Sequence, residues 1–252
     1  MNGIFDSHAH YDDKKFDEDR AQVLAALPSL GVQTVLNCGT TVSSSLLCLR
    51  MAEQYDYIFA ACGIHPHDAE GDMANIEQLP TLLRHEKCVA VGEIGLDYHY
   101  DFSPRDIQKT AFERQLQMAN ELQMPVIIHD REAHEDTWNL LQKYKPAGVV
   151  HCFSGSAEMA KEIVKLGMYI GFGGALTFKG AKKPLEAAAA VPKDRILMET
   201  DCPYMAPVPH RGKRCDSSMI PLSAAVIADI WSCSVQEVLD TTADNARQLF
   251  CI

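Results

Sequence analysis

Short apolar runs of β type alternate with longer segments of helical periodicity along this chain, and that alternation limits its fold more than any other feature. Such alternation is typical of a parallel α/β sheet, whose strands are buried on both faces and therefore read as nearly continuous apolar runs. The predicted strands are Gly3–Ser7, Gln33–Cys38, Tyr57–Gly63, Val89–Glu93, Val126–His129, Gly148–His151, Tyr169–Phe172 and Ile196–Asp201.

The segments between these strands carry apolar residues at helical spacing. The clearest helix is predicted at Asp106–Gln123, because Ser103 and Pro104 supply a capping hydroxyl and a first-turn proline just before it. Eight strand–helix units in 252 residues match a (β/α)8 TIM barrel, an α/β fold that we predict for a single domain over residues 1–252. A doubly wound open sheet is the alternative that alternation leaves open. The predicted closing helices are Leu222–Trp231, Val235–Leu239 and Asn245–Phe250.

Composition places the chain among globular proteins, with 47% hydrophobic residues and a mean hydropathy of −0.12. No basic and then apolar leader follows Met1, and no apolar run is long enough for a membrane span. These features predict a cytoplasmic protein. The nine cysteines show no CxxC pair, which favours reduced packing residues over a disulfide framework.

The net charge of −11 disfavours a protein that grips long stretches of nucleic acid through phosphates. It does not disfavour an enzyme that captures one strand end, because bound divalent cations invert the charge of an acidic pocket. The charge therefore disfavours a sequence-scanning DNA binder and leaves a metal-dependent enzyme open.

Imidazole and carboxylate side chains follow five of the predicted strands, at the end of a barrel where active sites are built. Each of them alone would fit a hydrogen-bonded core residue or a helix cap, but buried acids at several strand ends are costly without partners. Six such groups exceed the needs of one tetrahedral ion, so we predict two divalent ions with Glu93 as the bridge. The candidate metal ligands are His8, His10, Glu93, His129, His151 and Asp201.

The ordered motifs that contain these residues resemble the TatD-type deoxyribonucleases, a branch of the metal-dependent, amidohydrolase-like TIM barrels. The resemblance implies that the six candidates bind divalent metal, with Mg²⁺ or Mn²⁺ for activity and Zn²⁺ also suited to the sites. It also implies hydrolysis of phosphodiester bonds in DNA, from the 3′ end of single strands. The motifs are Asp6–His10, Gly63–His67, Gly92–Tyr98, Pro125–His129, His151–Gly155 and Glu199–Tyr204.

One segment departs from the family pattern. After Arg211–Arg214 the family usually continues Asn-Glu-Pro, whereas this chain has Cys215-Asp216-Ser217. Asp216 is the candidate replacement for the missing acidic group. The departure bears on the role of this loop and on substrate preference, but it leaves the metal ligands untouched.

Catalytic roles are assigned to Asp201, as acceptor of a proton from the attacking water, and to Glu93. His65 and Arg131 are predicted to bind substrate phosphate. A turn-stabilising role for His65 and an ion pair between Arg131 and a ligand carboxylate are the alternatives. The basic run His210–Arg214 would guide a DNA strand or simply be solvated.

Three aromatic residues in the predicted loops, Phe102, Phe178 and Tyr204, could stack on bases, and ordinary packing is favoured for Phe102. Single-stranded DNA ends are the predicted partner, with no membrane and no obligate protein partner, and the chain is expected to be a monomer.

Two other functions compete with the nuclease. One is hydrolysis of a small amide, ester or lactone on the same scaffold. Relatives that act on amides often bridge the metals with a modified lysine on the fourth strand, where this chain has Glu93. The other is a binding protein that has lost catalysis, which the complete ligand set disfavours.

Overall fold

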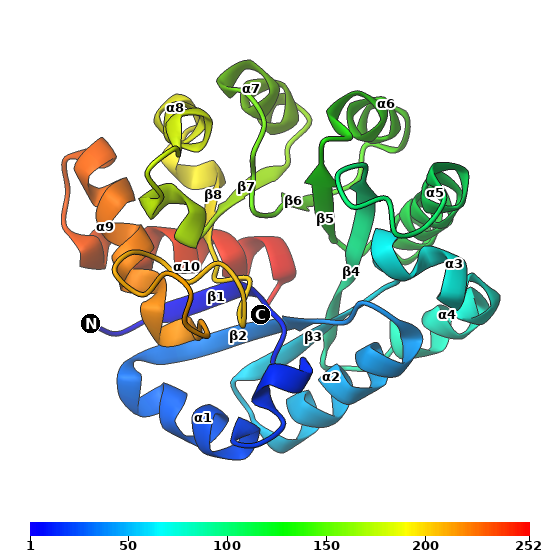
Figure 1. Ribbon diagram of the computed structural model, residues 1–252, viewed down its shortest axis with the longest axis horizontal. Coiled ribbons are helices and arrows are strands. Elements are labelled where there is room, and N and C mark those ends of the chain that lie inside the picture. The colour runs from blue at the N-terminus through cyan, green and yellow to red at the C-terminus, as the bar shows by residue number, and fades with distance from the viewer. The chain divides into compact units, whose positions relative to one another are not determined.

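The computed structural model describes residues 1–252, and its strands follow one another in the sheet in chain order (Figure 1). The pairs β1–β2, β3–β4, β4–β5, β5–β6 and β7–β8 are parallel. Ala9, at the end of β1, bridges Cys202 in parallel just after β8. These features define a (β/α)8 barrel, so the predicted fold is confirmed and the open-sheet alternative is wrong. The strands are β1 (Ile4–Ala9), β2 (Val32–Cys38), β3 (Ile58–Cys62), β4 (Cys88–Asp97), β5 (Val126–Arg131), β6 (Gly148–Val150), β7 (Tyr169–Phe172) and β8 (Ile196–Met198).

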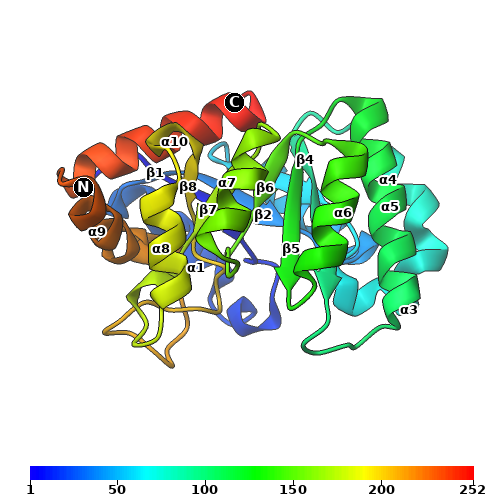
Figure 2. The ribbon, with the colours of Figure 1, turned by 90° about the horizontal axis from the view of Figure 1, so that it is seen from above.

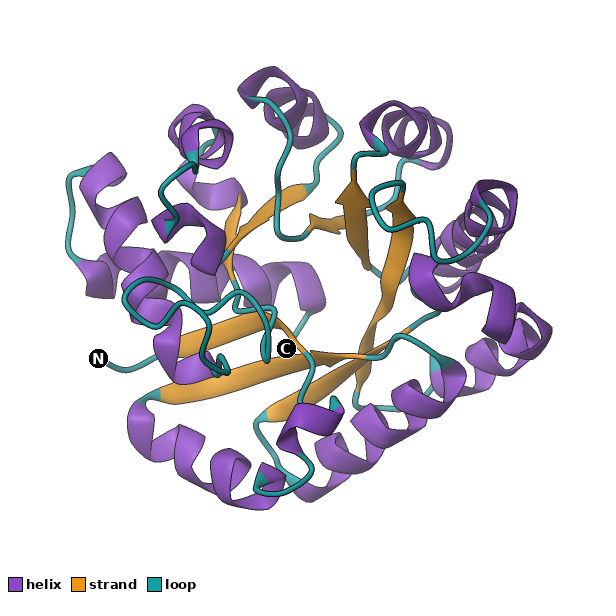
Figure 3. Ribbon diagram, viewed as in Figure 1, coloured by secondary structure: helices purple, strands orange, loops and turns teal.

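Helical segments lie between consecutive strands, as Figure 3 shows by colour. The α-helices are α1 (Arg20–Ala26), α2 (Val42–Gln54), α3 (Ala69–Asp72), α4 (Leu79–Leu82), α5 (Arg105–Leu122), α6 (His134–Tyr144), α7 (Ala157–Lys165), α8 (Lys182–Ala190), α9 (Ile220–Trp231) and α10 (Val235–Phe250). Short 3-10 helices are η1 (Lys14–Phe16), η2 (Leu27–Leu30), η3 (Pro66–Asp68), η4 (Met73–Gln78), η5 (Gly174–Thr177), η6 (Lys193–Arg195) and η7 (Ser217–Met219).

Contacts divide the chain into two compact units. The first comprises residues 1–37, 152–165 and 169–252, and the second comprises residues 38–151 and 166–168. In the first unit α10 packs on β1 and β8 (Figure 2). In the second unit α5 covers β4 and buries Phe112 and Leu116 completely. The single domain over residues 1–252 stays a prediction.

The eighth strand ends at Met198 rather than at the predicted Asp201. Two further predicted boundaries are wrong because a tertiary contact carries the element past a polar residue. Strand β4 does not end at Glu93, because Ile94 and Leu96 continue to pair with β5, and Asp97 is the last residue of the strand. The break predicted within the final helix is absent. Buried Asn245 donates its side-chain amide to the carbonyls of Lys193 and Ile196, and this tertiary contact holds α10 continuous over Val235–Phe250.

No single helix combines the length and the apolar composition of a membrane span; only the bent pair 217–231 and 235–250 meets both criteria when counted together.

Strands β4 and β5 approach each other closely at Gly95. Its φ is +145°, and a Cβ atom there would lie 1.9 Å from the carbonyl oxygen of His129. We expect Gly95→Ala to lower the free energy of unfolding by about 2–5 kcal/mol, from overpacking and backbone strain together. Urea denaturation measures the change. Gly71→Ala is the matched control, because a Cβ there meets nothing within 4 Å. Equal stability of the Gly95 variant and the control would contradict this account.

Candidate metal centre

The first group of candidate ligands lies in the first unit, where β1 ends beside the chain that leaves β8. His8 and His10 are two residues apart in extended backbone, so their rings lie on the same side, with the Nε2 atoms 2.9 Å apart. Asp201 Oδ1 lies 3.6 Å from His8 Nε2 and 3.5 Å from His10 Nε2. Donor atoms on one tetrahedral ion stand about 3.4 Å apart. The three side chains therefore fit a single divalent ion.

Backbone hydrogen bonds hold this first group in place. The amide of Asp201 donates to the carbonyl of His8 over 2.9 Å, and the amide of His10 donates to the carbonyl of Cys202 over 2.7 Å. Asp201 has a φ of +60°, in the left-handed region that aspartate tolerates better than most residues. The turn after β8 is thereby fixed against the end of β1, which sets the position of the Asp201 carboxylate.

A buried carboxylate, Asp6, ties the two chain segments together beneath the first group. Its Oδ2 accepts hydrogen bonds from the hydroxyls of Thr200, over 2.6 Å, and Ser217, over 2.7 Å. Its Oδ1 accepts from the amides of Thr200 and His8. Complete burial raises the pKa of Asp6 to about 7, against the lowering effect of these bonds. Asp6 therefore orders the backbone on both sides of the ligands.

The second group of candidate ligands lies in the second unit, around a buried carboxylate on β4. Glu93 Oε1 lies 2.7 Å from His151 Nε2 and 2.9 Å from His129 Nδ1. The two imidazole nitrogens are themselves 3.3 Å apart. His65 Nε2 approaches the same oxygen at 3.4 Å. A buried carboxylate surrounded by imidazoles is the donor set that a divalent transition metal prefers, so this group also fits an ion.

His65 and His129 differ in how they are held. Burial lowers the pKa of His65 to about 4, so the ring is neutral at neutral pH. Its Nδ1 accepts a hydrogen bond from the amide of His67, which places its proton on Nε2, toward Glu93. His129 Nε2 lies 3.0 Å from Asp97 Oδ2, so Asp97 and Glu93 contact opposite nitrogens of the same ring.

Asp97 is a positioning carboxylate at the end of β4, and its side chain is completely buried. Burial acts to raise its pKa, but hydrogen bonds, with His129 and with the amide of Tyr100 foremost, hold that pKa well below the usual range. A carboxylate that fixes the second nitrogen of a ligating histidine orients the ring and raises its basicity. Asp97 therefore belongs to the site although it does not face Glu93.

We expect Asp97→Asn to weaken divalent-metal binding by about 10–100-fold, the usual cost of removing such a partner. The asparagine oxygen still serves backbone amides, but its NH₂ group replaces an acceptor opposite His129. Isothermal titration with Mn²⁺ measures the affinity. Asp101→Asn is the matched control, since Asp101 lies in the loop that follows β4 and pairs with exposed Arg105. Unchanged affinity in the Asp97 variant would contradict the assigned role.

Comparison with known proteins identifies the family. A family model described as "TatD related DNase" matches residues 5–251. The chain belongs to the TatD family. The metal-dependent hydrolase YabD of Bacillus subtilis, itself described as uncharacterized, is 42% identical over 99% of each chain. The "3′-5′ ssDNA/RNA exonuclease TatD" of Rahnella is 34% identical and covers 99% of this chain and 98% of that protein.

Solved structures agree with this assignment. YjjV, a TatD homologue from Escherichia coli, superposes with a TM-score of 0.93 at 31% identity, over 99% of this chain and 98% of that one. The phosphotriesterase homology protein of the same organism shares the fold alone, with a TM-score of 0.69 at 15% identity over 99% of each chain. The chain is a metal-dependent hydrolase of the TatD family, as its motifs predict.

The segment that departs from the TatD pattern has a local structural role. Asp216 Oδ1 accepts from the amide of Ser218 over 2.9 Å and so caps the 3-10 helix η7. Ser217 is completely buried and donates its hydroxyl to Asp6, while Cys215 is buried beside it. The segment therefore supports the backbone beneath His8, and the Asp216 carboxylate serves as a cap.

Arg131 and two arginines of the basic run His210–Arg214 contact aromatic or acidic residues of the chain itself. Arg131 is exposed, with its guanidinium 4.8 Å from the centre of the Tyr100 ring. Arg214, in the basic run, forms a two-pronged ion pair with Asp19 over 2.6 and 2.7 Å. Arg211 lies over the ring of Phe178 at 3.5 Å. The basic run is therefore partly engaged with the chain itself.

Sequence reasoning was wrong about Phe102. Packing was the favoured interpretation, but 65% of the Phe102 surface is exposed. The roles of Asp6 and Ser217 were not predicted at all. The role of Asp6 could have been suspected, because Asp6 begins the first family motif. No sequence motif points to Ser217, which lies in the segment that differs from the family pattern.

Proposed function

We propose that this TatD-family hydrolase is a divalent-metal-dependent nuclease that removes nucleotides from the 3′ ends of single-stranded DNA. The observation that carries the proposal is that each unit gathers imidazole and carboxylate donors suited to a divalent ion, around Asp201 in the first unit and around Glu93 in the second. Paired divalent ions are a recurrent device for in-line displacement at phosphorus. The name of the Rahnella relative supports nucleic acid as the substrate.

The six predicted ligands divide into two sets under this proposal. His8, His10 and Asp201 would hold one ion, and Glu93, His129 and His151 would hold the other. Two ions, the identity of each as Mg²⁺, Mn²⁺ or Zn²⁺, and the bridging role of Glu93 stay predictions. When bound, divalent ions lower the pKa of water toward neutrality and neutralise charge on phosphoryl oxygens.

Asp201 is the group that can meet a water molecule. Its side chain is 21% exposed, whereas the His8 side chain is completely buried. A carboxylate beside the attacking water would accept the proton that the water loses, while the new P–O bond forms and the P–O bond to the leaving 3′ oxygen of the strand breaks. The leaving oxygen takes up a proton from solvent. The protonated Asp201 then returns that proton to solvent through its exposed side.

Substrate contacts are assigned to the second unit. Arg131 is exposed at the end of β5, where a guanidinium can bind phosphate oxygens. His65 stays the proposed partner of a nonbridging oxygen. A cytoplasmic location and a monomeric state stay predictions.

Digestion of labelled oligonucleotides tests the proposal. Chelator-treated protein is mixed with single-stranded DNA that is labelled at the 5′ end or at the 3′ end, with and without Mg²⁺ or Mn²⁺. We expect shortening only with metal, and a 5′ label that moves through a ladder of successively shorter products. Intact strands from metal-loaded protein would overturn the proposal and favour hydrolysis of a small amide, ester or lactone.

A further inference from the structure

Two aromatic rings lie exposed in the loop that follows β4. Tyr100 and Phe102 stack on each other, with ring centres 5.3 Å apart and planes inclined by 21°. Their exposed fractions are 48% and 65%. Exposure of large apolar surface to water is unfavourable. A stacked and exposed aromatic pair therefore indicates a surface that binds a ligand.

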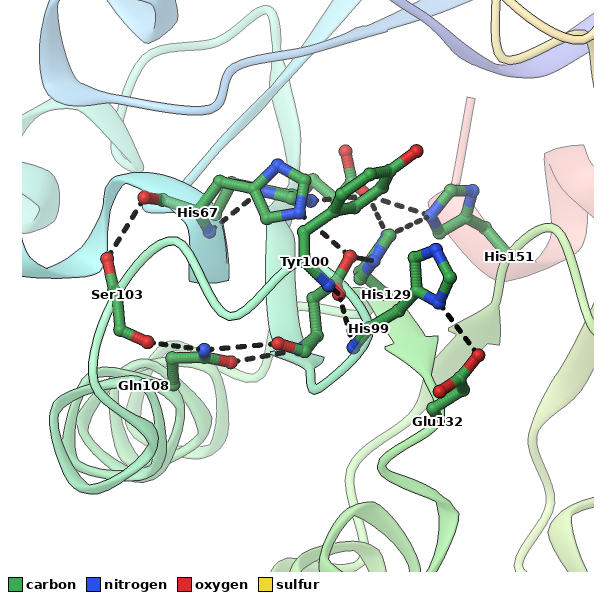
Figure 4. A network of polar contacts seen from close by, with 11 residues as sticks. His67, His99, Tyr100, Ser103, Gln108, His129, Glu132 and His151 are labelled. Atoms are coloured by element: carbon green, nitrogen blue, oxygen red, sulfur yellow. Dashed lines mark hydrogen bonds and ion pairs between the residues drawn. The ribbon is translucent and has the colours of Figure 1, made fainter.

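The loop that presents these rings is firmly anchored. The amides of His99 and Tyr100 donate to Asp97 Oδ1 over 3.0 and 2.8 Å. Buried Gln108 donates to the carbonyls of Asp97 and Ser103 over 3.1 and 2.8 Å (Figure 4). The loop is therefore already ordered before a ligand binds. Binding at these rings costs little further conformational entropy of the loop, which favours affinity.

The rings lie next to the second group of candidate ligands. The His67 ring lies edge to face with Phe102, with ring centres 4.9 Å apart. Its centre also lies 6.0 Å from the centre of the His129 ring. The same His67 ring lies 2.8 Å from Asp97 Oδ2. One imidazole thus separates Phe102 from His129, a distance that a single nucleotide can span.

Charge around the rings favours a base over a phosphate at Phe102. Phe102 and His67 line a cavity of ≈ 360 Å³ whose wall also carries Asp68, Glu70 and Asp72. These carboxylates repel phosphate oxygens but can accept hydrogen bonds from base amino groups. Arg131 lies beside Tyr100, and its positive charge can bind the phosphate backbone of the strand.

We propose that Tyr100 and Phe102 form a stacking platform for an unpaired nucleobase of the strand whose phosphate lies at the metal centre. The proposal rests on the proposed nuclease function and extends it to recognition of single strands. Bases stack on aromatic side chains without strong sequence preference, because every base has a π face. A paired base in a duplex has both faces covered, so the platform selects unpaired ends.

Two substrates test the platform. One is a single-stranded oligonucleotide, and the other is the same strand with base-free tetrahydrofuran residues at its 3′ end. We expect Phe102→Ala to lower the ratio of the two kcat/KM values, base-bearing over base-free, by about 10-fold, within the range measured for base–aromatic stacking. Phe102→Trp preserves a flat aromatic face and should keep that ratio within about 2-fold of the wild-type value.

Leu46→Ala is the matched control, because it removes another exposed apolar side chain, from helix α2. It should leave both kcat/KM values unchanged. Unfolding midpoints and metal content establish that each variant is folded and loaded. A wild-type ratio in Phe102→Ala would overturn the platform and leave the nuclease standing. Failure of the wild-type protein to cut either strand would overturn the nuclease proposal itself.

Discussion

Glu93→Ala is expected to abolish metal-dependent hydrolysis, with kcat/KM falling by well over about 100-fold, since loss of even an outer partner of a ligand costs 10–100-fold. The reason is geometric: Glu93 Oε1 is the atom on which His151 and His129 converge, at 2.7 and 2.9 Å. Without that carboxylate the imidazoles lose both a hydrogen-bond partner and the negative charge that attracts a cation. Steady-state kinetics with a DNA strand, together with metal analysis of the purified variant, measure both effects.

Glu53→Ala is the matched control for this change. Glu53 also pairs with a histidine, His85, at 3.1 Å, but it does so on the surface, and the Glu53 side chain is 58% exposed. Its removal should change neither metal content nor kcat/KM. If Glu93→Ala retained wild-type activity, the second group of ligands would have no part in catalysis.

Asp201→Asn is expected to lower kcat by about 10²–10⁴-fold, the usual contribution of a general base. Asparagine keeps the size of the side chain and one oxygen that can face His8 and His10, but it accepts a proton poorly. Metal should therefore still bind at saturating ion concentration while turnover is lost. Single-turnover kinetics at several Mn²⁺ concentrations separate the two effects.

Asp216→Asn is the control for Asp201→Asn, because it makes the same chemical change in the same loop. Asparagine caps helices as well as aspartate does, so stability and kcat should both stay near wild type. Full turnover of Asp201→Asn with its metal content intact would refute the assignment of Asp201 as the proton acceptor.

The barrel and the ligand candidates can be predicted from the sequence because both depend on local pattern. Apolar runs mark the strands. The polar residues His151 and Asp201 follow the runs of β6 and β8, at the end of the barrel where active sites are built. The pairs that now face each other at 3.5–3.6 Å, around Asp201, follow from topology alone once strands β1 and β8 are neighbours. Family motifs then limit the chemistry.

Other features depend on contacts that no local pattern reveals. The extension of β4 to Asp97 is decided by pairing with β5, and the exposure of Phe102 is decided by how its loop is anchored. Ser217 reaches Asp6 across 211 positions of sequence. Such long-range contacts override local preference, so they become visible only in three dimensions.

The anchor of the loop after β4 also bears on how easily this enzyme could acquire new substrates. The Asp97 carboxylate accepts hydrogen bonds from the backbone amides of His99 and Tyr100 rather than from their side chains. Every residue except proline offers such an amide. Side chains at these positions are thus free to vary by mutation while the loop keeps its path. A library that randomises positions 99, 100 and 102 without proline would therefore explore new specificities on an unaltered scaffold.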